Sequence, residues 1–276
     1  MTSAQPPLEH GFTAVDAQED PQTWIRVLDT LGREPFYVAY KRRLLEMVAP
    51  DPDGRYLDVG GGIGGGAQAL VVLTEARAQV VVVDRSLTMA TEASRRGTTS
   101  VVGMAETMPF GAASFDGAWA DRTFQHLIDP ELALAEMLRV TRAGGRVVVV
   151  DPDYDTQVVD VDDQDLARRV LRFRADHLLR NGTLAHRVPG MFVAAGLVDV
   201  QVEAMTLLVR DHTAVDNVMG LRSWATTANE RGLLDAEDAL AWPDAIDRAV
   251  ASGRFLYAVT FFLTTGTRPP TSADRA

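Results

Sequence analysis

Short apolar runs alternate with segments of helical spacing between residues 51 and 153. Buried strands are predicted at YLDVG, AQVVVVD, TSVVG, FDGAWAD and GRVVVVDPD. Helices are predicted between them at GAQALVVLTEA, SLTMATEASRR and PELALAEMLRVT, where apolar residues recur with a period near 3.6. Strands that alternate with helices in this way predict a parallel, doubly wound α/β sheet.

Segments of helical spacing also flank this core. The region 21–48 indicates two helices that break near LGREP, and we assign residues 1–50 to an N-terminal helical cap. Residues 51–276 form the predicted core, with a helical insertion at about 211–253 between two late strands, LVDVQVEAMTLLVR and RFLYAVTFFLTT. The complete prediction is a Rossmann-like, seven-stranded sheet, mostly parallel with an antiparallel C-terminal edge strand, plus helical lid elements.

Composition excludes several classes of function. The chain has 276 residues, no cysteine, a formal charge of −11 and a single lysine, Lys41. Disulfides and thiolate chemistry are therefore excluded, and the negative field disfavours a nucleic-acid partner. No apolar run reaches membrane-spanning length and no basic leader opens the sequence, so a cytoplasmic location without a membrane partner is expected.

Six glycines fill seven positions from Gly60 to Gly66, directly after the first predicted strand. Their spacing fits both G-x-G-x-x-G, typical of dinucleotide sites, and the D-x-G-x-G-x-G turn of S-adenosylmethionine (SAM) sites; a tight turn without a ligand is the third possibility. Asp84 ends the second strand, where an acid binds the ribose of either cofactor. Asp58 favours SAM, because a carboxylate repels a pyrophosphate but attracts the ammonium group of a methionine moiety.

The successive motifs YLDVGGGIGGG, VVVDRSLTMATEASRRG and VVGMAETMPFGAASFDGAWADRTFQHLIDPELALAEMLRVTRAGGRVVVVDPD together resemble the class I SAM-dependent methyltransferases over about residues 55–153. The branch they are most similar to is the small-molecule one that includes ubiquinone/menaquinone-biosynthesis methyltransferases. The resemblance implies SAM as cofactor and S-adenosylhomocysteine as product. It implies that the cofactor contacts include Asp58, Gly60, Gly62, Gly64, Asp84, Arg85, Met89, Met104, Ala105 and Glu106.

One motif departs from the family pattern. The segment after the third strand usually reads G-D-A-E, and its acid accepts from the adenine amino group; here it reads Gly103-Met104-Ala105-Glu106. A methionine packs on adenine but does not accept those hydrogens as a carboxylate does. The adenine contact is therefore expected to come from backbone or to be lost.

The segment after the fourth strand is where donor and acceptor are expected to meet. His126 is the candidate catalytic base, because its unperturbed pKa is near working pH; a structural role in a short helix is the alternative. Asp121 and Arg122 either border the methionine end of the cofactor or form an ordinary helix-entry pair.

The run DPDYDTQVVDVDDQD follows the fifth strand and is interpreted as a solvated acidic loop above the acceptor pocket. Within it, Asp153 and Tyr154 are candidate substrate contacts. Neither a calcium loop nor an amino-methylating motif fits this run, and the five histidines have no close metal spacing, so no metal site is predicted.

The predicted acceptor pocket draws on the N-terminal helices and the late insertion. Aromatic residues there, with Tyr37, Tyr40 and Trp224 as substrate candidates, suit an apolar or aromatic small molecule, or else they seal helices onto the core. Arg172, Arg174 and Arg187 either recognise an acidic acceptor or belong to a solvated helix face.

The predicted function is SAM-dependent methyl transfer to a small molecule in secondary-metabolite biosynthesis, with O-methylation favoured over C- or N-methylation. The alternative is an enzyme of the same fold that binds SAM but catalyses a cyclisation or rearrangement. Two further hypotheses are a non-catalytic SAM-binding module and a nicotinamide oxidoreductase. Asp58 argues against the oxidoreductase.

Overall fold

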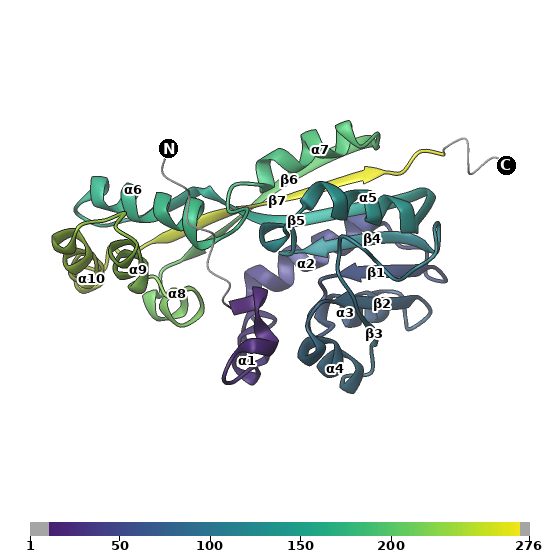
Figure 1. Cartoon of the computed structure of the whole chain (residues 1–276), viewed down its shortest axis with the longest axis horizontal. Coiled ribbons are helices and arrows are strands. Elements are labelled where there is room, and N and C mark those ends of the chain that lie inside the picture. The colour runs from purple at the N-terminus through teal and green to yellow at the C-terminus, as the bar shows by residue number, and fades with distance from the viewer. Residues whose placement is uncertain (1–10, 271–276) are drawn as a thin grey trace.

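Seven strands form one mixed sheet in the order β3-β2-β1-β4-β5-β7-β6 (Figure 1). The computed structural model describes residues 11–270, apart from the side chains of 214, 217 and 218. The strands β1 to β5 run parallel, whereas β7 is antiparallel to both β5 and β6. Their bounds are β1 Arg55–Val59, β2 Gln79–Asp84, β3 Thr99–Val102, β4 Phe115–Asp121, β5 Thr141–Val159, β6 Val198–Val209 and β7 Tyr257–Thr267.

This architecture confirms the predicted fold class, with one refinement at the C-terminal edge. The antiparallel strand β7 lies between β5 and β6, so the edge strand is β6. The sheet order reverses between β1 and β4, and ligands of doubly wound folds bind at such a point, beyond the carboxyl ends of the strands.

Helices cover both faces of the sheet because the strand side chains alternate. Leu57 and Val81 pack with α5 and α7 on one face, whereas Val80 and Val82 pack with α2 and α3 on the other. The α-helices are α1 Gln22–Leu31, α2 Pro35–Val48, α3 Gly65–Leu73, α4 Leu87–Arg95, α5 Pro130–Val140, α6 Gln164–Phe173, α7 Val188–Ala194, α8 His212–Met219, α9 Ser223–Glu230 and α10 Ala236–Ala251.

Local sequence signals set the helix boundaries near the site. Ser86 caps α4 by accepting from the backbone N–H of Met89, and Asp129 caps α5 in the same way through Leu132. Pro35 and Pro130 occupy first helical positions, where a missing N–H has no consequence.

The acidic run after the fifth strand corrects the sequence interpretation. Instead of a solvated loop, β5 continues to Val159 and pairs with β7, with a register shift between Asp153 and Val158. Asp151 and Asp153 are buried, so charge density alone was a misleading sign of a wet loop.

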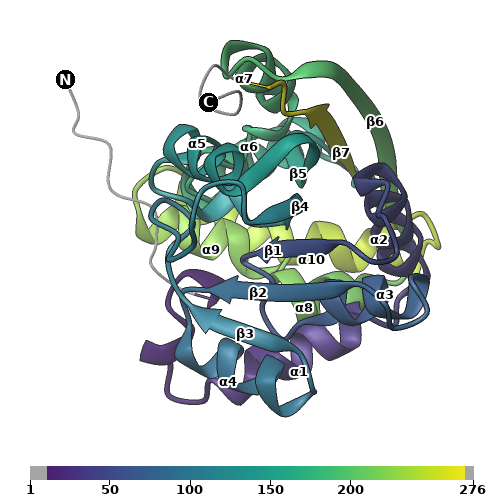
Figure 2. The same cartoon turned by 90° about the vertical axis from the view of Figure 1, so that its right-hand side faces the viewer.

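The N-terminal segment, residues 11–31, packs against α4, whereas the late helices α9 and α10 pack against α6. The short helix η2 (Val15–Ala17) contacts α4, and an ion pair joins Asp29 of α1 to Arg96 at the end of α4 (Figure 2). The helices α8, α9 and α10 lie between β6 and β7 in the chain, and α9 packs on α6 and α10. The division into a cap, a core and an insertion stays a prediction.

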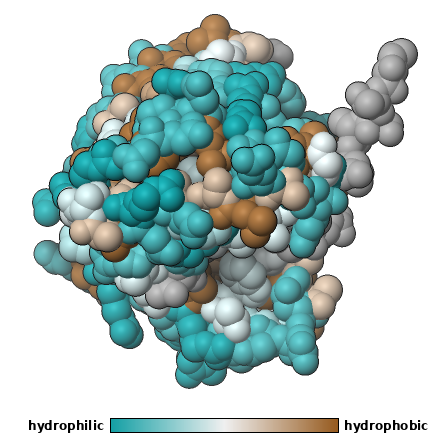
Figure 3. Space-filling model, turned by 90° about the vertical axis from the view of Figure 1, so that its left-hand side faces the viewer, coloured by the Kyte–Doolittle hydropathy of each residue, from teal (hydrophilic) through white to brown (hydrophobic). Residues whose placement is uncertain are grey.

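The outer surface near the late helices is mostly hydrophilic, with scattered apolar side chains and a hollow in its lower half (Figure 3). No helix within residues 11–270 has the length and apolar character needed to cross a bilayer.

Candidate cofactor and acceptor site

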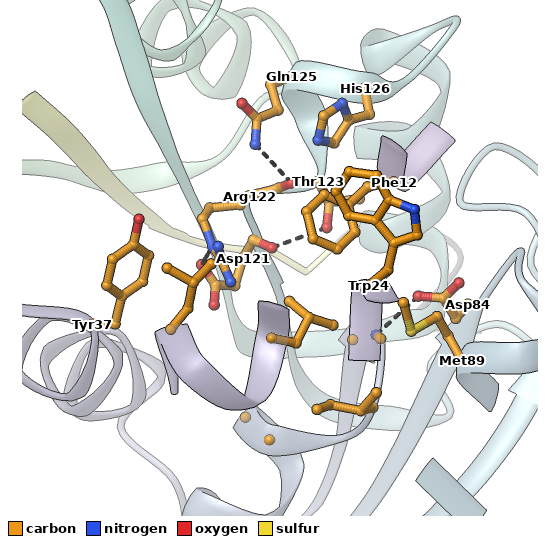
Figure 4. A pocket seen from close by; sticks show the side chains of 18 of the residues that line it. Phe12, Trp24, Tyr37, Asp84, Met89, Asp121, Arg122, Thr123, Gln125 and His126 are labelled. Atoms are coloured by element: carbon orange, nitrogen blue, oxygen red, sulfur yellow. Dashed lines mark hydrogen bonds and ion pairs between the residues drawn. The ribbon is translucent and has the colours of Figure 1, made fainter. Parts of the chain in front are cut away.

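One large cavity of about 1170 Å³ opens at the carboxyl ends of β1, β2, β4 and β5. Its lining includes the glycine loop, the N-terminal segment and residues of α8 and α9. A pocket for one ligand usually has about 300–1,000 Å³. The cavity is therefore large enough for a cofactor and an acceptor together. Figure 4 shows Asp84 and Met89 on one side, Tyr37 on the other, and Asp121 and Arg122 between them.

The glycine loop between β1 and α3 has a backbone that other residues would strain. Gly60, Gly62 and Gly64 have φ values of +67°, +55° and +82°, in the left-handed region. A Cβ atom on Gly61 would lie 2.6 Å from Cγ of Asp58. The loop therefore needs glycine both for its conformation and for its close approach to the carboxylate below it.

Asp58 is a buried carboxyl at the end of β1, 1% exposed, against the underside of this loop. Burial, with Asp121 and Asp84 nearby, raises its pKa to about 7, although Lys41 opposes the change. The indole Nε1 of Trp119, also buried and on the cavity wall, has no hydrogen-bond partner among the described residues. An indole N–H without a partner and a buried carboxyl thus lie beside the loop.

Asp84 ends β2 and holds the loop from the other side. Its Oδ2 accepts from the backbone N–H of Gly62 at 2.9 Å, and its Oδ1 accepts from that of Ser86 at 2.8 Å. Burial raises its pKa, while these two bonds oppose the rise. Nearby, Met89 is buried and lines the cavity, whereas Arg85 lines it with an exposed side chain.

The segment after β3 forms another part of the wall. Met104, Ala105 and Glu106 all line the cavity, and Met104 is 46% exposed. Glu106 is buried, and its Oε1 accepts from the backbone N–H of Ile128 at 3.3 Å. The glutamate therefore also ties this segment to the chain beyond β4.

Asp121 at the end of β4 is the centre of a polar network. The hydroxyl of Tyr40 donates to its Oδ1 at 2.9 Å, and Nζ of Lys41 lies 3.4 Å from its Oδ2. The Nε of Arg122 lies 3.5 Å from Oδ1. Tyr40 is fully buried and is absent from the described lining of the cavity, so it supports Asp121 from behind.

His126 lies on the short helix η3 (Phe124–His126), on the cavity wall. Its backbone N–H donates to the carbonyl of Thr123 at 2.9 Å, and its ring centroid is 6.4 Å from that of Phe12 (Figure 4). The imidazole thus lies beside Phe12 of the N-terminal segment.

The structure places some of the candidate acceptor contacts on the cavity wall and another inside the fold. Tyr37, Tyr154 and Trp224 line the cavity. Asp153 is fully buried and does not belong to the described lining; its Oδ2 lies 2.5 Å from Nδ1 of His186 and accepts from the backbone N–H of that residue at 2.9 Å. Its contacts are therefore internal to the fold.

The three candidate arginines, Arg172, Arg174 and Arg187, have different surroundings. Arg172 is exposed and pairs with Asp155 and Asp176, and Arg187 lines a small separate pocket. Arg174 is 6% exposed and lines the large cavity from η4 (Arg174–Leu178). Helical spacing alone could not distinguish these cases.

The N-terminal segment covers the end of the cavity near Met89. The sequence did not predict this covering. Phe12, Trp24 and Leu28 pack on Ile63 of the glycine loop and on Met89. No motif announces this arrangement, because it depends on packing between segments distant in sequence.

Asp16 fastens this segment to α4. Its carboxylate accepts from the hydroxyl of Ser86 at 2.8 Å and from the backbone N–H groups of Leu87 and Thr88 at 2.9 and 3.0 Å. Partial burial opposes ionisation, but bonds from Thr88, Ser86 and Leu87 lower the pKa of Asp16 to about 2. The fastening is therefore ionised throughout the neutral range.

Sequence comparison relates the chain to methyltransferases. Residues 57–149 match the model of the methyltransferase domain family. An uncharacterized 37.1 kDa protein in transposon TN4556 of Streptomyces fradiae is 31% identical, over 89% of this chain and 72% of that protein. Demethylmenaquinone methyltransferase of Renibacterium salmoninarum is 34% identical, over 42% of this chain and 49% of that enzyme. The chain thus spans about half the length of that enzyme.

Solved structures share the fold over most of the chain. Phosphoethanolamine N-methyltransferase 2 of Haemonchus contortus is 19% identical with a TM-score of 0.59, covering 95% of this chain and 61% of that one. The cyclase SpnF is 18% identical with a TM-score of 0.56, covering 98% of this chain and all of that one. At such identities the likeness extends to the fold alone.

Proposed function

This chain belongs to the class I SAM-dependent methyltransferase family, and from that premise we propose that it transfers a methyl group from SAM to a small-molecule acceptor. The observation that carries the proposal is the arrangement of Asp58, the glycine loop and Asp84 at one end of a cavity with room for a second ligand. The activity and substrate of the whole protein are part of this proposal.

The residues at that end fit the family's cofactor. Asp58 is held at a pKa of about 7 by burial and neighbouring acids, so a cationic ammonium group beside it would relieve the unfavourable charge. The oxygens of Asp84 each retain acceptor capacity for a ribose hydroxyl. We assign Asp58, Gly60, Gly62, Gly64 and Asp84 to the methionine and ribose parts, and Arg85, Met89, Met104, Ala105 and Glu106 to the adenine side.

When bound, SAM supplies a methyl group activated by a sulfonium. The chain has to exclude water, hold the acceptor in line and take up a proton where the acceptor loses one. We assign the proton to His126, which lines the cavity across from Phe12. Asp121, braced by Tyr40 and Lys41, borders the space between the two ends.

The base assignment makes a kinetic prediction. Replacing His126 by Asn should lower kcat by about 100-fold, within the usual range for a general base, and leave SAM affinity unchanged. Steady-state kinetics and calorimetry on the same variant measure the two effects. An unchanged kcat would assign His126 a structural role.

The acceptor is proposed to be apolar or aromatic, with O-methylation favoured, in secondary-metabolite biosynthesis in the cytoplasm. Tyr37, Tyr154 and Trp224 support this proposal because they present aromatic surface to the cavity. The charge of −11 disfavours a nucleic-acid acceptor.

Product analysis tests the proposed reaction against a cyclisation on the same fold. The protein is incubated with SAM and a panel of phenolic and enolic compounds, and S-adenosylhomocysteine and products are quantified by mass spectrometry. One S-adenosylhomocysteine per methylated product supports the proposal. Turnover of an acceptor with SAM unconsumed would support a cyclisation or rearrangement instead.

A further inference from the structure

Two guanidinium groups line the cavity beyond Asp121, and they outnumber the acids available to pair with them. Arg174 is 6% exposed, and no carboxylate of residues 11–270 lies within ion-pair distance of it. Its Nη1 donates to Oε1 of Gln157 at 2.8 Å, and that is the one hydrogen bond of its guanidinium within the described part of the chain. Burying a cation without an anion is costly, so this arrangement requires an explanation.

Aromatic rings hold the Arg174 guanidinium in place. Its Cζ lies 4.0 Å from the ring centroid of Tyr154 and 4.4 Å from that of Trp224. Such stacking offsets part of the desolvation cost and leaves the edge of the planar group free to donate. Both rings line the same cavity as the arginine.

Arg122 contributes the second guanidinium. Its Cζ lies 5.1 Å from the ring centroid of Tyr37, and its buried Nε has no hydrogen-bond partner in the described residues. Arg122 has a φ of +54°, which is uncommon for a residue with a side chain. Burial raises the pKa of Tyr37 to about 12, but Arg122 and Arg174 both oppose the rise, so both guanidiniums act on the same hydroxyl.

The nearby acids do not balance these charges. Asp121 is shared between Arg122 and Lys41, and Asp216 on the cavity wall pairs with Arg222. Asp151 also faces Arg122, but burial holds the pKa of its carboxyl well above its usual range, which weakens it as a counter-charge. The acceptor end therefore has an excess of positive charge inside a protein that is negative as a whole.

We propose that the methyl acceptor carries an anionic oxygen group, a carboxylate or a phosphate ester, that Arg174 and Arg122 bind between the rings of Tyr37, Tyr154 and Trp224. This inference rests on the proposed function, whose acceptor it defines as an acid with an aromatic or apolar body. Planar, bidentate donation suits both anions, and the surrounding rings suit the body.

The experiment measures binding rather than turnover. The full chain, saturated with S-adenosylhomocysteine, is titrated in a calorimeter with 2-naphthoate, 2-naphthyl phosphate and the uncharged 2-naphthamide. We expect at least one anion to bind about 10- to 100-fold more tightly than the amide, as charge-assisted hydrogen bonds predict. The anion that binds more tightly shows whether the acceptor's anionic group is a carboxylate or a phosphate ester. Equal binding of anions and amide, or no binding of either anion at millimolar concentration, would overturn the proposal.

Variants locate the effect on Arg174. R174Q should weaken binding of the better anion about tenfold or more, and R174K, which keeps the charge without the planar fork, should weaken it less. The matched control is R172Q, because Arg172 lies two residues away but is exposed and paired outside the cavity. Unaltered binding by R174Q, or equal losses in R174Q and R172Q, would contradict the assignment.

A separate readout distinguishes this inference from the proposed function. Unchanged S-adenosylhomocysteine affinity in R174Q shows that the variant is folded, and if R174Q does not fold, R174K carries the test. If S-adenosylhomocysteine fails to bind the unmodified protein while 2-naphthoate binds through Arg174, the proposed function fails and the anion site stands.

Discussion

At the residue scale, the proposed role of Asp58 connects cofactor binding to stability. Its carboxyl is buried beneath the glycine loop, and burial together with Asp121 and Asp84 raises its pKa to about 7. Between its unfolded pKa near 3.8 and about 7, the folded state retains a proton that the unfolded state has lost. Stability therefore falls as pH rises through that window. A cation bound beside the ionised carboxylate would offset this loss of stability.

Replacing Asp58 by Asn should stabilise the ligand-free protein and weaken SAM binding. The isostere removes a buried charge, so at about pH 8 the free energy of unfolding should rise by on the order of 2 kcal/mol. SAM affinity of the unmodified protein should increase from about pH 6 to about pH 8 as Asp58 ionises, and the variant should lose that dependence. Urea denaturation and calorimetry measure these effects; a pH-independent affinity in the unmodified protein would contradict the account.

A substitution of Asp153 tests whether this buried carboxylate stabilises the fold. Its buried carboxylate accepts from the backbone N–H groups of His186 and Asp155, so Asp153→Ala leaves two donors unpaired. We expect a loss of about 1–3 kcal/mol in urea denaturation. Asp155→Ala, which removes a partly exposed carboxylate two residues away, should cost much less. Equal losses would argue that Asp153 has no special structural role.

At the element scale, the N-terminal segment covers the end of the cavity near Met89, where we propose that the cofactor binds. Phe12, Trp24 and Leu28 cover Ile63 and Met89, and Asp16 joins the segment to the start of α4. Because the pKa of Asp16 is lowered to about 2, its contribution is complete above the unfolded value of 3.8 and is lost only as pH falls through about 2.

Asp16→Ala should loosen this segment. Loss of the bonds that Asp16 accepts from Ser86, Leu87 and Thr88 should cost about 0.5–2 kcal/mol, weaken SAM binding severalfold and speed proteolytic cleavage near residue 20. Asp20→Ala is the matched control, because the Asp20 carboxylate accepts from Gln22, Thr23 and Arg26 in the first turns of α1 and makes no other side-chain hydrogen bond within residues 11–270. Equal protease sensitivity in both variants would show that Asp16 does not hold the segment.

The secondary-structure elements differ in how well the sequence predicts them. The five parallel strands and the helices between them could be predicted because their apolar periods are regular and their turns are marked by glycine and proline. The extension of β5 from Tyr154 to Val159 could not, because it depends on pairing with β7, as between Val158 and Ala258, and on the bond that Asp153 accepts from His186, 33 residues away. Tertiary hydrogen bonds of this kind leave no local pattern.

At the scale of the whole molecule, the two ends of the cavity differ in how well sequence identifies them. The residues of the cofactor end, Asp58 to Glu106, fall within the family match of 57–149. Most residues of the acceptor end, Tyr37, Tyr154, Arg174 and Trp224, lie outside this match, whereas Arg122 lies within it. The cofactor site could therefore be proposed from motifs, whereas the division of Arg172, Arg174 and Arg187 among surface, cavity and small pocket required the fold.

The most direct measurement of the central claim is a calorimetric titration of the full chain with SAM, with NADH as the competing cofactor. We expect one SAM per chain, a large loss of SAM affinity in Asp84→Ala, and no heat with NADH, because Asp58 presents a carboxylate where a pyrophosphate would lie. Tight NADH binding without SAM binding would contradict this claim.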